Sequence, residues 1–344
     1  MKILITGASG FIGSFLCEEG LKLGMETWAG MREHSSRKWL QHEKLQFAFL
    51  DMTKPDVLSQ QLAKYKERIG KWDIIIHAAG ATKCLHPEDF DKHNFECTKT
   101  LVTTLHSLDM LPQQFLYVSS LSVLGAIKED MVDGKYQDLL STDTPQPNTA
   151  YGASKVKSEK WLKEFGEAND AFCYTIFRPT GVYGPREKDY YLMAQNIKAH
   201  IDFGAGFKPQ VITFVYVRDL VAAIFAAIGK GDIANGKIYH VSDGCNYNSR
   251  AFSDLIQKEL DISGVLHVTA PLWFLRMVCA VGGAISSLTK KLSALNNDKY
   301  MILSQRNWQC DITPIQRDLG YNPQWQLERG VKECIAWYKT NGWL

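Results

Sequence analysis

A glycine-rich turn near the start of the chain constrains the fold more than any other feature. The apolar residues 2–6 predict a short buried strand, and Gly7, Gly10 and Gly13 follow it at regular spacing. The apolar pattern then predicts a helix that ends near Gly24. Between a strand and a helix, such glycines allow a tight turn and let the backbone approach a pyrophosphate. The sequence therefore predicts a dinucleotide site whose pyrophosphate rests on the N–H groups of the helix start.

The second predicted strand, residues 26–31, ends without the acidic residue that usually binds the ribose 2′-hydroxyl of NAD. Met31 stands at that position, and the loop after it is basic and rich in hydroxyl groups. The side chains in question are those of Arg32, Ser35, Ser36, Arg37 and Lys38. Because arginine binds phosphate through two hydrogen bonds, the loop favours the 2′-phosphate of NADP over NAD. A solvated loop that binds nothing is the alternative.

Strands and helices alternate through the first third of the chain. Further strands are predicted over 45–50, 72–77 and 115–119, and a helix over 90–108 carries Asn94. This alternation is typical of an α/β fold with a doubly wound parallel sheet. A late strand within about 211–241, at 237–241, is expected to return to that sheet.

Ligands of such sheets bind at the carboxyl ends of the strands. Asp51 follows the third strand and is expected to meet the adenine amino group. Ala78, Ala79 and Gly80 follow the fourth strand and leave room for a ribose. His77, just before them, is interpreted as a packed strand-end residue rather than a catalyst.

Tyr151 and Lys155 lie four residues apart on a predicted helix that Asn148 or Thr149 caps. They therefore share one face of that helix. A neighbouring ammonium group, together with an oxidised nicotinamide, lowers the pKa of a tyrosine toward neutrality and makes it a usable acid and base. Taken alone, the pair matches a solvated helix face equally well.

Composition excludes several classes of protein. The 39 basic and 37 acidic residues give a net charge of +2, which offers no argument for nucleic acid as a partner. The eight cysteines stand singly, so neither a disulfide framework nor a metal site is predicted. The strand at residues 2–6 leaves no room for a signal peptide, and a cytoplasmic protein is expected.

The segment 272–288 is nearly long enough to span a bilayer, but Arg276 interrupts it and glycines and serines dilute it. We interpret it as a buried or lid helix. Contact with a membrane is the alternative, and stable insertion is not expected.

Seven motifs together resemble the extended short-chain dehydrogenase/reductase family, also called the NAD-dependent epimerase/dehydratase family. They are Thr-Gly-Ala-Ser-Gly-Phe-Ile-Gly at 6–13, His-Ala-Ala-Gly at 77–80, Val-Ser-Ser at 118–120, Tyr-Gly-Ala-Ser-Lys at 151–155, Arg-Pro-Thr-Gly-Val-Tyr-Gly-Pro at 178–185, Phe-Val-Tyr-Val-Arg-Asp at 214–219 and Asp-Leu-Gly-Tyr-Asn-Pro at 318–323. The resemblance runs nearly to the C-terminus. It implies a Rossmann domain over 1–178 and a smaller, interleaved substrate-binding region over 179–344.

The resemblance also implies roles for individual residues. Tyr151 is expected to be the general acid and base, Lys155 to bind the ribose and tune Tyr151, and Ser120 to orient the substrate oxygen. Ser119 and Ser122 are the alternatives to Ser120. The residues expected to bind the cofactor are Gly7, Ser9, Gly10, Phe11, Ile12, Gly13, Arg32, Arg37, Asp51, Met52, Ala78, Ala79, Gly80, Val118, Tyr151, Lys155, Pro179 and Val182. A homodimer formed through the helices 90–108 and 151–166 is implied as well.

The substrate-binding half points away from sugar nucleotides. Members that bind them usually carry an arginine for the diphosphate before the 214–219 motif, and here that stretch is Ile212-Thr-Phe214. Aromatic residues are frequent toward the C-terminus, as in the hydroxysteroid dehydrogenase and dihydroflavonol reductase branch. Trp337 and Tyr338 are expected to belong to the core.

Three functions remain open on the sequence alone. The first is an NADP-dependent oxidoreductase that acts on a ketone, aldehyde or secondary alcohol of a small apolar molecule. The second is a nucleotide-sugar epimerase or dehydratase with tightly bound NAD. A non-catalytic dinucleotide sensor is the third, which the presence of Tyr151, Lys155 and Ser120 disfavours.

Overall fold

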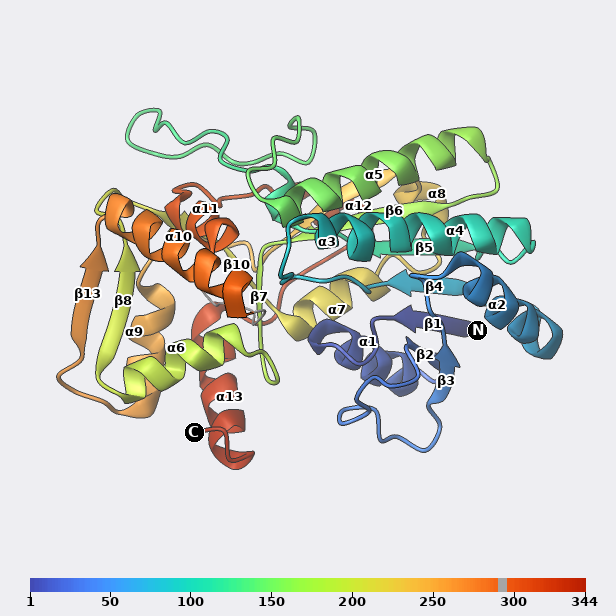
Figure 1. Ribbon diagram of the computed structural model, residues 1–344, viewed down its shortest axis with the longest axis horizontal. Coiled ribbons are helices and arrows are strands. Elements are labelled where there is room, and N and C mark those ends of the chain that lie inside the picture. The colour runs from blue at the N-terminus through green and yellow to red at the C-terminus, as the bar shows by residue number, and fades with distance from the viewer. Residues whose placement is uncertain (290–295) are drawn as a thin grey trace.

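Seven parallel strands form the central sheet in the order β11-β6-β5-β4-β1-β2-β3 (Figure 1). The computed structural model describes residues 1–289 and 296–344, except for the side chains of 284–288. In sheet order the strands are β11 (Lys237–Val241), β6 (Tyr174–Pro179), β5 (Gln114–Val118), β4 (Ile74–His77), β1 (Lys2–Thr6), β2 (Glu26–Met31) and β3 (Gln46–Phe49). The order reverses beside β1, which places the glycine turn at the switch point where doubly wound sheets bind ligands.

Apolar side chains on both faces explain why these strands lie inside the molecule. In β1, Ile3 and Ile5 point to one face and Leu4 to the other, and all three are fully buried. Ile5 pairs with Ala29 of β2 and with Ile76 of β4. Continuous apolar runs of this kind are expected when helices cover both faces of a parallel sheet.

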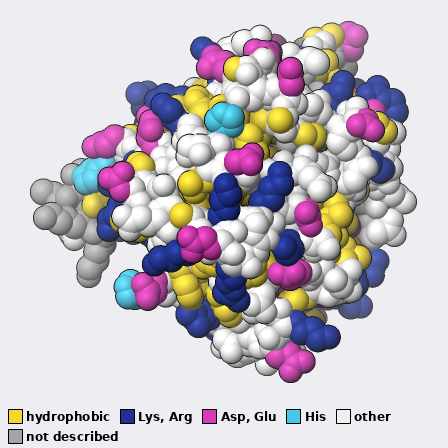
Figure 2. Space-filling view, turned by 90° about the vertical axis from the view of Figure 1, so that its right-hand side faces the viewer, with side chains coloured by type: hydrophobic (Ala, Val, Ile, Leu, Met, Phe, Trp, Pro, Cys, Tyr) yellow, Lys and Arg dark blue, Asp and Glu magenta, His cyan; other side chains and the backbone are white. Residues whose placement is uncertain are grey.

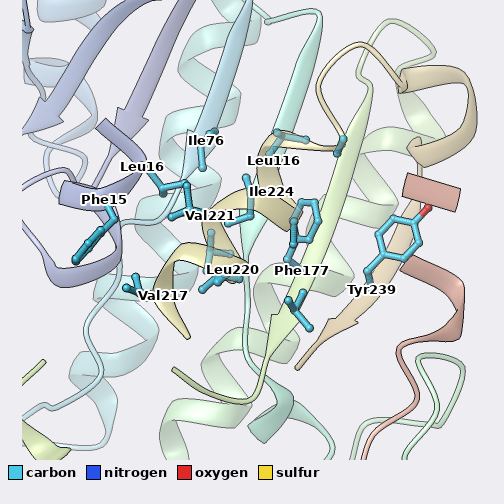
Figure 3. Packing of buried hydrophobic residues seen from close by; sticks show 14 of the residues in the cluster. Phe15, Leu16, Ile76, Leu116, Phe177, Val217, Leu220, Val221, Ile224 and Tyr239 are labelled. Atoms are coloured by element: carbon cyan, nitrogen blue, oxygen red, sulfur yellow. The ribbon is translucent and has the colours of Figure 1, made fainter. Parts of the chain in front are cut away.

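Two layers of helices supply that cover. One face is covered by α1 (Phe11–Lys22), α7 (Val217–Phe225), α8 (Gly231–Ala234) and α12 (Thr313–Leu319), and the other by α2 (Pro55–Ile69), α4 (Cys97–Ser107) and α5 (Ala150–Ala168). Figure 3 shows Leu220, Val221 and Ile224 of α7 between Phe15 and Leu16 of α1 and the strands. A helix from the second half of the chain therefore completes the core of the first half.

The smaller region lies beyond the carboxyl ends of the strands (Figure 1). It contains three short strand pairs and five helices. The strand pairs are β7 (Gly181–Tyr183) with β10 (Phe214–Tyr216), β9 (Val211–Ile212) with β12 (Tyr247–Asn248), and β8 (Ile201–Ala205) with β13 (Leu266–Ala270). The helices are α6 (Asp189–Lys198), α9 (Ala251–Leu260), α10 (Leu272–Thr289), α11 (Asn297–Ser304) and α13 (Leu327–Thr340). Its core is aromatic, with the ring of Tyr183 in edge contact with those of Phe214 and Phe252.

The predicted doubly wound α/β fold is confirmed, and so is the late strand at 237–241. The predicted helix 90–108 forms with one departure. Between the short helix α3 (Glu88–Phe90) and α4, the residues Asp91–Glu96 form a π-helical segment, η1. Of the two proposed caps of α5, Thr149 acts, because its hydroxyl accepts the N–H of Gly152 at 2.9 Å. Tyr338 is buried and Trp337 packs against the same core, as expected.

The segment 272–288 is expected to be a buried or a lid helix, and the structure corrects the first alternative. It forms α10, but several of its apolar side chains are exposed: Trp273 by 70% and Val281 by 54%. The lid alternative stays a prediction. The side chains of 284–288 lie outside the described part of the chain. Among the helices that the structure describes, none combines the length and the apolar character needed to cross a bilayer.

Charged side chains do not gather by sign on the face that Figure 2 shows. Basic and acidic groups lie among one another there, as the nearly balanced composition predicts. That face therefore has no broad region of a single charge that would attract a polyanion.

The packing of α7 generates a stability prediction. Leu220 is fully buried between α1 and the sheet, so Leu220→Ala leaves a cavity there. We expect the free energy of unfolding to fall by about 2–5 kcal/mol in denaturant titrations. Ala222 lies on the exposed side of the same helix, and Ala222→Ser is the matched control, with little expected change. Equal effects of the two substitutions would contradict this account of α7.

Candidate active site

The glycine turn forms a cradle that side chains would fill. Gly7 has a φ of +70°, and a Cβ atom on it would lie 2.7 Å from the carbonyl oxygen of Ala78. A Cβ atom on Gly13 would lie 2.1 Å from the carbonyl oxygen of Gly7. Close packing of the turn, α1 and the end of β4 therefore requires glycine at both positions.

The start of α1 suits an anion. Gly10 precedes the helix without a side-chain cap, and the first turn contains no acidic residue. The N–H groups at this helix start, among them those of Phe11 and Ile12, thus remain for a phosphate. Ser9 belongs to the same turn. The residues present fit the pyrophosphate of a dinucleotide.

The two arginines expected to bind the cofactor near the end of β2, Arg32 and Arg37, lie in different surroundings. Met31 is buried, and Arg32 follows it on the surface with no ion pair to any residue in the described ranges. The guanidinium of Arg37 lies over the rings of Phe47 and Phe49, at 4.8 and 5.3 Å from their centroids. The aromatic side chains of β3 therefore hold Arg37, whereas Arg32 is free to meet a ligand.

Asp51 lies at the end of β3, where an adenine is expected. Its carboxylate accepts hydrogen bonds from the hydroxyl of Thr53 at 2.6 Å and from the Thr53 N–H at 3.2 Å. The hydroxyl bond is the main reason that the pKa of Asp51 lies below its usual value. Met52 beside it packs against the core. Asp51 is thus an ionised acceptor, as a contact with the adenine amino group requires.

His77 ends β4 and is fully enclosed. Its Nδ1 lies 2.7 Å from the hydroxyl of Thr6 and its Nε2 lies 2.9 Å from that of Thr98. Burial, followed by the positive charge of Lys155, lowers the pKa of His77 to about 3. These contacts match the interpretation of His77 as a packed strand-end residue.

The residues after β4 lie against η1. Asn94 Oδ1 accepts the N–H of Ala81 at 2.7 Å, and Asn94 Nδ2 donates to the hydroxyl of Ser154 at 2.9 Å. A Cβ atom on Gly80 would lie 2.8 Å from Asn94 Oδ1 and 3.4 Å from Lys155 Nζ. The close approach of Gly80 to Asn94 and Lys155 therefore depends on glycine.

Ser120 and Tyr151 lie close together but come from two different elements. Ser120 follows β5, and its hydroxyl lies 2.8 Å from that of Ser122 and accepts the Ser122 N–H at 3.2 Å. Tyr151 lies in the first turn of α5, with its ring 5.9 Å from that of Phe90. Burial raises the pKa of Tyr151 to about 12, and a hydrogen bond with Ser120 offsets part of that shift. The predicted lowering of this pKa stays a prediction for the protein with a nicotinamide bound.

Lys155 is a buried cation one turn further along α5. Its Nζ donates to the carbonyl oxygen of Val118 at 2.9 Å and lies 4.7 Å from the centroid of the Tyr117 ring. Burial lowers the pKa of Lys155 to about 8, whereas the negative charge of Glu159 acts in the opposite direction. The end of β5 thus fixes the ammonium group beside Gly80, where a ribose hydroxyl is expected.

Glu159 connects three parts of the site, and the sequence analysis did not identify it. Its carboxylate forms a buried ion pair with Arg178 at 2.6 Å and accepts the hydroxyl of Ser119 at 2.5 Å. Arg178 immediately precedes Pro179 at the end of β6. Ser119 therefore anchors the end of β5 to α5, whereas the hydroxyl of Ser120 bonds with Ser122.

The expected nicotinamide flank lies beside this ion pair. Pro179 ends β6 and pairs with Val241, while Val182 lies in β7 opposite Val215. The hydroxyl of Thr180 between them is buried and has no hydrogen-bond partner among the described residues. An unsatisfied buried hydroxyl at this position fits a polar ligand group.

The C-terminal half reaches the start of α5. The carboxylate of Asp298 in α11 accepts the N–H groups of Ala150 and Tyr151 at 3.3 and 3.4 Å. Nearby, Asp189 pairs with Lys83 and lies 3.9 Å from the Nζ of Lys299. The smaller region therefore closes over Tyr151 through polar contacts.

The geometry leaves three side chains that sequence reasoning did not assign: Asn94, Glu159 and Asp298. Glu159 follows Lys155 by four residues, so its spacing alone could have placed it on the same helix face. The other two offer no such signal, because their partners are distant in sequence. No group of three or more potential metal ligands occurs in the ranges that the structure describes.

A glycine cradle at the switch point, together with a half-buried tyrosine and a buried lysine on one helix face, fits a dinucleotide cofactor. The profile of the NAD dependent epimerase/dehydratase family matches residues 3–242, which is more than half of the chain. The chain belongs to this family, whose members are extended short-chain dehydrogenases/reductases. Its cofactor is a nicotinamide adenine dinucleotide.

Relatives and solved structures extend the similarity over the whole chain. YtcB of Bacillus subtilis (strain 168), described as an uncharacterized UDP-glucose epimerase, is 27% identical, with 99% of this chain and 98% of that protein covered. A 3-beta-hydroxysteroid dehydrogenase of Mycolicibacterium neoaurum is 26% identical, with 98% and 91% covered. The dTDP-glucose 4,6-dehydratase of Bacillus anthracis, solved in complex with NAD, has a TM-score of 0.76 at 17% identity, with 99% and 97% covered. These proteins catalyse different reactions, so the similarity defines the fold and family rather than a substrate.

The position of Tyr151 generates the first prediction for the site. Tyr151→Phe removes the phenolic proton and preserves the ring contact with Phe90. We expect turnover to fall roughly 10²–10⁴-fold while cofactor affinity stays within a few-fold. Tyr239→Phe is the control, because that hydroxyl binds Asp318 outside the site. Turnover that survives Tyr151→Phe would show that another group transfers the proton.

The buried Lys155 generates a pH prediction. Folding lowers its pKa from the ordinary 10.5 to about 8, so between these values the folded chain binds fewer protons than the unfolded chain. The resulting penalty is complete below pH 8 and disappears as the pH rises to 10.5. Lys155→Met removes this penalty. The gain in unfolding free energy of Lys155→Met over wild type should therefore be larger at pH 7 than at pH 10, as measured by denaturant titration. A difference in unfolding free energy that does not change with pH would contradict a buried charge here.

Proposed function

We propose that the protein is an NADP-dependent oxidoreductase that interconverts a carbonyl group and a secondary alcohol on a small apolar substrate. The position of Ser120 at the end of β5, beside Tyr151 and Lys155 on one face of α5, carries the proposal. Ser120 and Tyr151 offer two hydroxyl groups that can bind one substrate oxygen. Lys155 supplies a fixed positive charge one helical turn away.

In reduction, Tyr151 donates its proton to the substrate oxygen while Ser120 keeps that oxygen in place. The remaining phenolate is stabilised by the ammonium group of Lys155. When bound, the nicotinamide supplies the hydride in this direction and accepts it in the reverse direction. In oxidation, the phenolate of Tyr151 takes the proton of the alcohol, so burial of Tyr151 makes this direction favour high pH.

The preference for NADP rests on Arg32. It follows β2 directly, is exposed and has no ion-pair partner among the described residues. Arg37 contributes less, since it lies over Phe47 and Phe49. A guanidinium group at this position suits a 2′-phosphate through two parallel hydrogen bonds.

Two observations favour an apolar substrate over a nucleotide sugar. Ile212 stands where a diphosphate-binding arginine is expected, and the next residue, Thr213, is buried with its hydroxyl donating to the carbonyl oxygen of Trp308. The guanidinium of Arg306, within the smaller region, donates to the carbonyl oxygens of Ala205, Leu303 and Ser304. Because its donor groups bind the backbone, Arg306 is poorly placed to bind phosphates.

The alternative is a nucleotide-sugar epimerase or dehydratase. The similarity to YtcB and to the dTDP-glucose dehydratase fold supports it. In that case the cofactor is recycled within each turnover, and NAD stays bound to the protein.

We further propose a cytoplasmic homodimer formed through the outer surfaces of α4 and α5.

The role of Arg32 is tested by cofactor titration. For Arg32→Ala, we expect NADP affinity to fall roughly ten- to a hundredfold and NAD affinity to change little, since only NADP carries the 2′-phosphate. Arg68→Ala removes the same charge from the side of Trp28 and is the control. Equal loss of both cofactors would contradict the role, and tightly held NAD would favour the epimerase or dehydratase.

The substrate class is tested by turnover with matched substrates. Apolar ketones and their alcohols should show NADP(H)-dependent absorbance changes, whereas UDP-glucose and dTDP-glucose should be left unchanged. Epimerised or dehydrated sugar nucleotide without net cofactor consumption would overturn the proposal in favour of the alternative.

A further inference from the structure

The strands β8 and β13 and the start of α10 lie at the end of the smaller region, away from the central sheet (Figure 1). These elements carry exposed apolar side chains. They come from β8, the loop after it, β13 and the first half of α10. We call this set the apolar face: Phe203, Phe207, Leu266, Val268, Trp273, Phe274, Met277 and Val281. Soluble proteins seldom expose so many large apolar side chains together without a binding role.

The two-stranded sheet turns its apolar side outward. Val268 pairs directly with Phe203, so their side chains share one face of the sheet. The opposite face carries Asp202 and His267, which lie 3.1 Å apart, and Asp202 also pairs with Arg250 at the start of α9. Polar contacts therefore hold the inner side of this sheet, while Phe203, Phe207 and Leu266 are each more than 60% exposed.

The helix α10 continues this surface. Trp273, Met277 and Val281 follow one another at intervals of four residues and form one exposed stripe. Cys279 points inward and is buried, and Leu272 packs close to Gly206. Because β13 passes into α10 through a single residue, the stripe and the outer face of the sheet adjoin.

The charges around the apolar face are positive. The segments 203–210 and 262–289 contain no Asp or Glu, and Lys208 and Arg276 are their only Lys or Arg residues. Both are exposed and have no ion pair among the described residues. Two copies of the chain would bring like charges together across this face. An anionic bilayer instead offers an apolar boundary below a negatively charged surface, which complements both features.

We infer that the apolar face docks the protein on the surface of an anionic lipid bilayer. Tryptophan and phenylalanine are the side chains that favour the boundary between headgroups and acyl chains, and Lys208 and Arg276 meet the lipid phosphates. The docking is peripheral, since α10 does not meet the requirements for crossing a bilayer.

The docked face lies next to the site. Helix α11 packs against α10, and its Asp298 accepts the N–H groups at the start of α5. If the proposed function holds, an apolar substrate dissolved in the bilayer reaches Tyr151 from this side. The docking itself does not depend on that function, because it rests on exposure and charge alone.

The experiment is co-sedimentation of the full chain with vesicles at low ionic strength. One set of vesicles contains phosphatidylcholine alone and the other adds phosphatidylserine. We expect binding to the mixed vesicles that weakens with added salt. Trp273→Ser should weaken it by roughly tenfold or more, and the double substitution Lys208→Gln and Arg276→Gln by a similar factor. Leu23→Ser, which removes another exposed apolar side chain just after α1, should change it less than about twofold.

Several outcomes would overturn the inference. Wild-type chain that stays in solution with mixed vesicles at low salt would do so, and so would vesicle binding that Trp273→Ser leaves intact. Association of the chain with itself that Trp273→Ser abolishes, without vesicle binding, would assign the face to a second copy. Unchanged thermal unfolding and dinucleotide binding of each variant establish that it is folded. Failure of catalysis alone would bear on the proposed function and not on docking.

Discussion

The architecture of the site depends on the interactions of one buried carboxylate, that of Glu159. It joins α5 to β6 through Arg178 and to the end of β5 through Ser119. Removing one partner of such a pair leaves a charge stranded in a medium where solvation is poor, at a cost of about 3–5 kcal/mol. The pair therefore ties together the three elements that carry Tyr151, Ser120 and Pro179. It also places a negative charge one turn from Lys155, which helps that lysine to remain an ammonium group.

Around this pair, the site consists of a rigid half and a closing half. The rigid half is the carboxyl edge of the parallel sheet, where packed glycines and buried hydrogen bonds leave little freedom to Gly7, His77 and Lys155. The closing half is contributed by the smaller region, which reaches Tyr151 through surface ion pairs and the two long hydrogen bonds of Asp298. Contacts of this kind contribute little free energy each, so they suit a boundary that opens for a substrate.

The same division explains how one fold serves relatives with different reactions. Gly7, His77 and Lys155 lie in or beside the sheet, where packing restricts change. The strand pairs and helices of the smaller region lie outside the sheet and have their own aromatic core. Epimerases, dehydratases and hydroxysteroid dehydrogenases at similar identity to this chain are consistent with such a division.

The sequence by itself determined the central sheet, the glycine turn and the helix that carries Tyr151 and Lys155. These features follow from local rules: apolar runs, helical spacing and the steric demands of glycine. The sequence also predicted that His77 is a packed residue, because it ends an apolar strand.

Only the tertiary structure decided the contacts that join distant segments. Asn94 meets Ala81 and Ser154, and Asp298 meets the start of α5, across separations that no periodic pattern encodes. The sequence placed Arg32 and Arg37 in one phosphate-binding loop, and folding drew Arg37 onto the aromatic rings of β3. The apolar residues of α10 predicted a helix that is either buried or a lid, and the exposure of half or more of Trp273, Met277 and Val281 overturns the buried alternative. These differences have one physical reason. Contacts and burial depend on which distant segments pack against a residue, and a local sequence pattern does not contain that information.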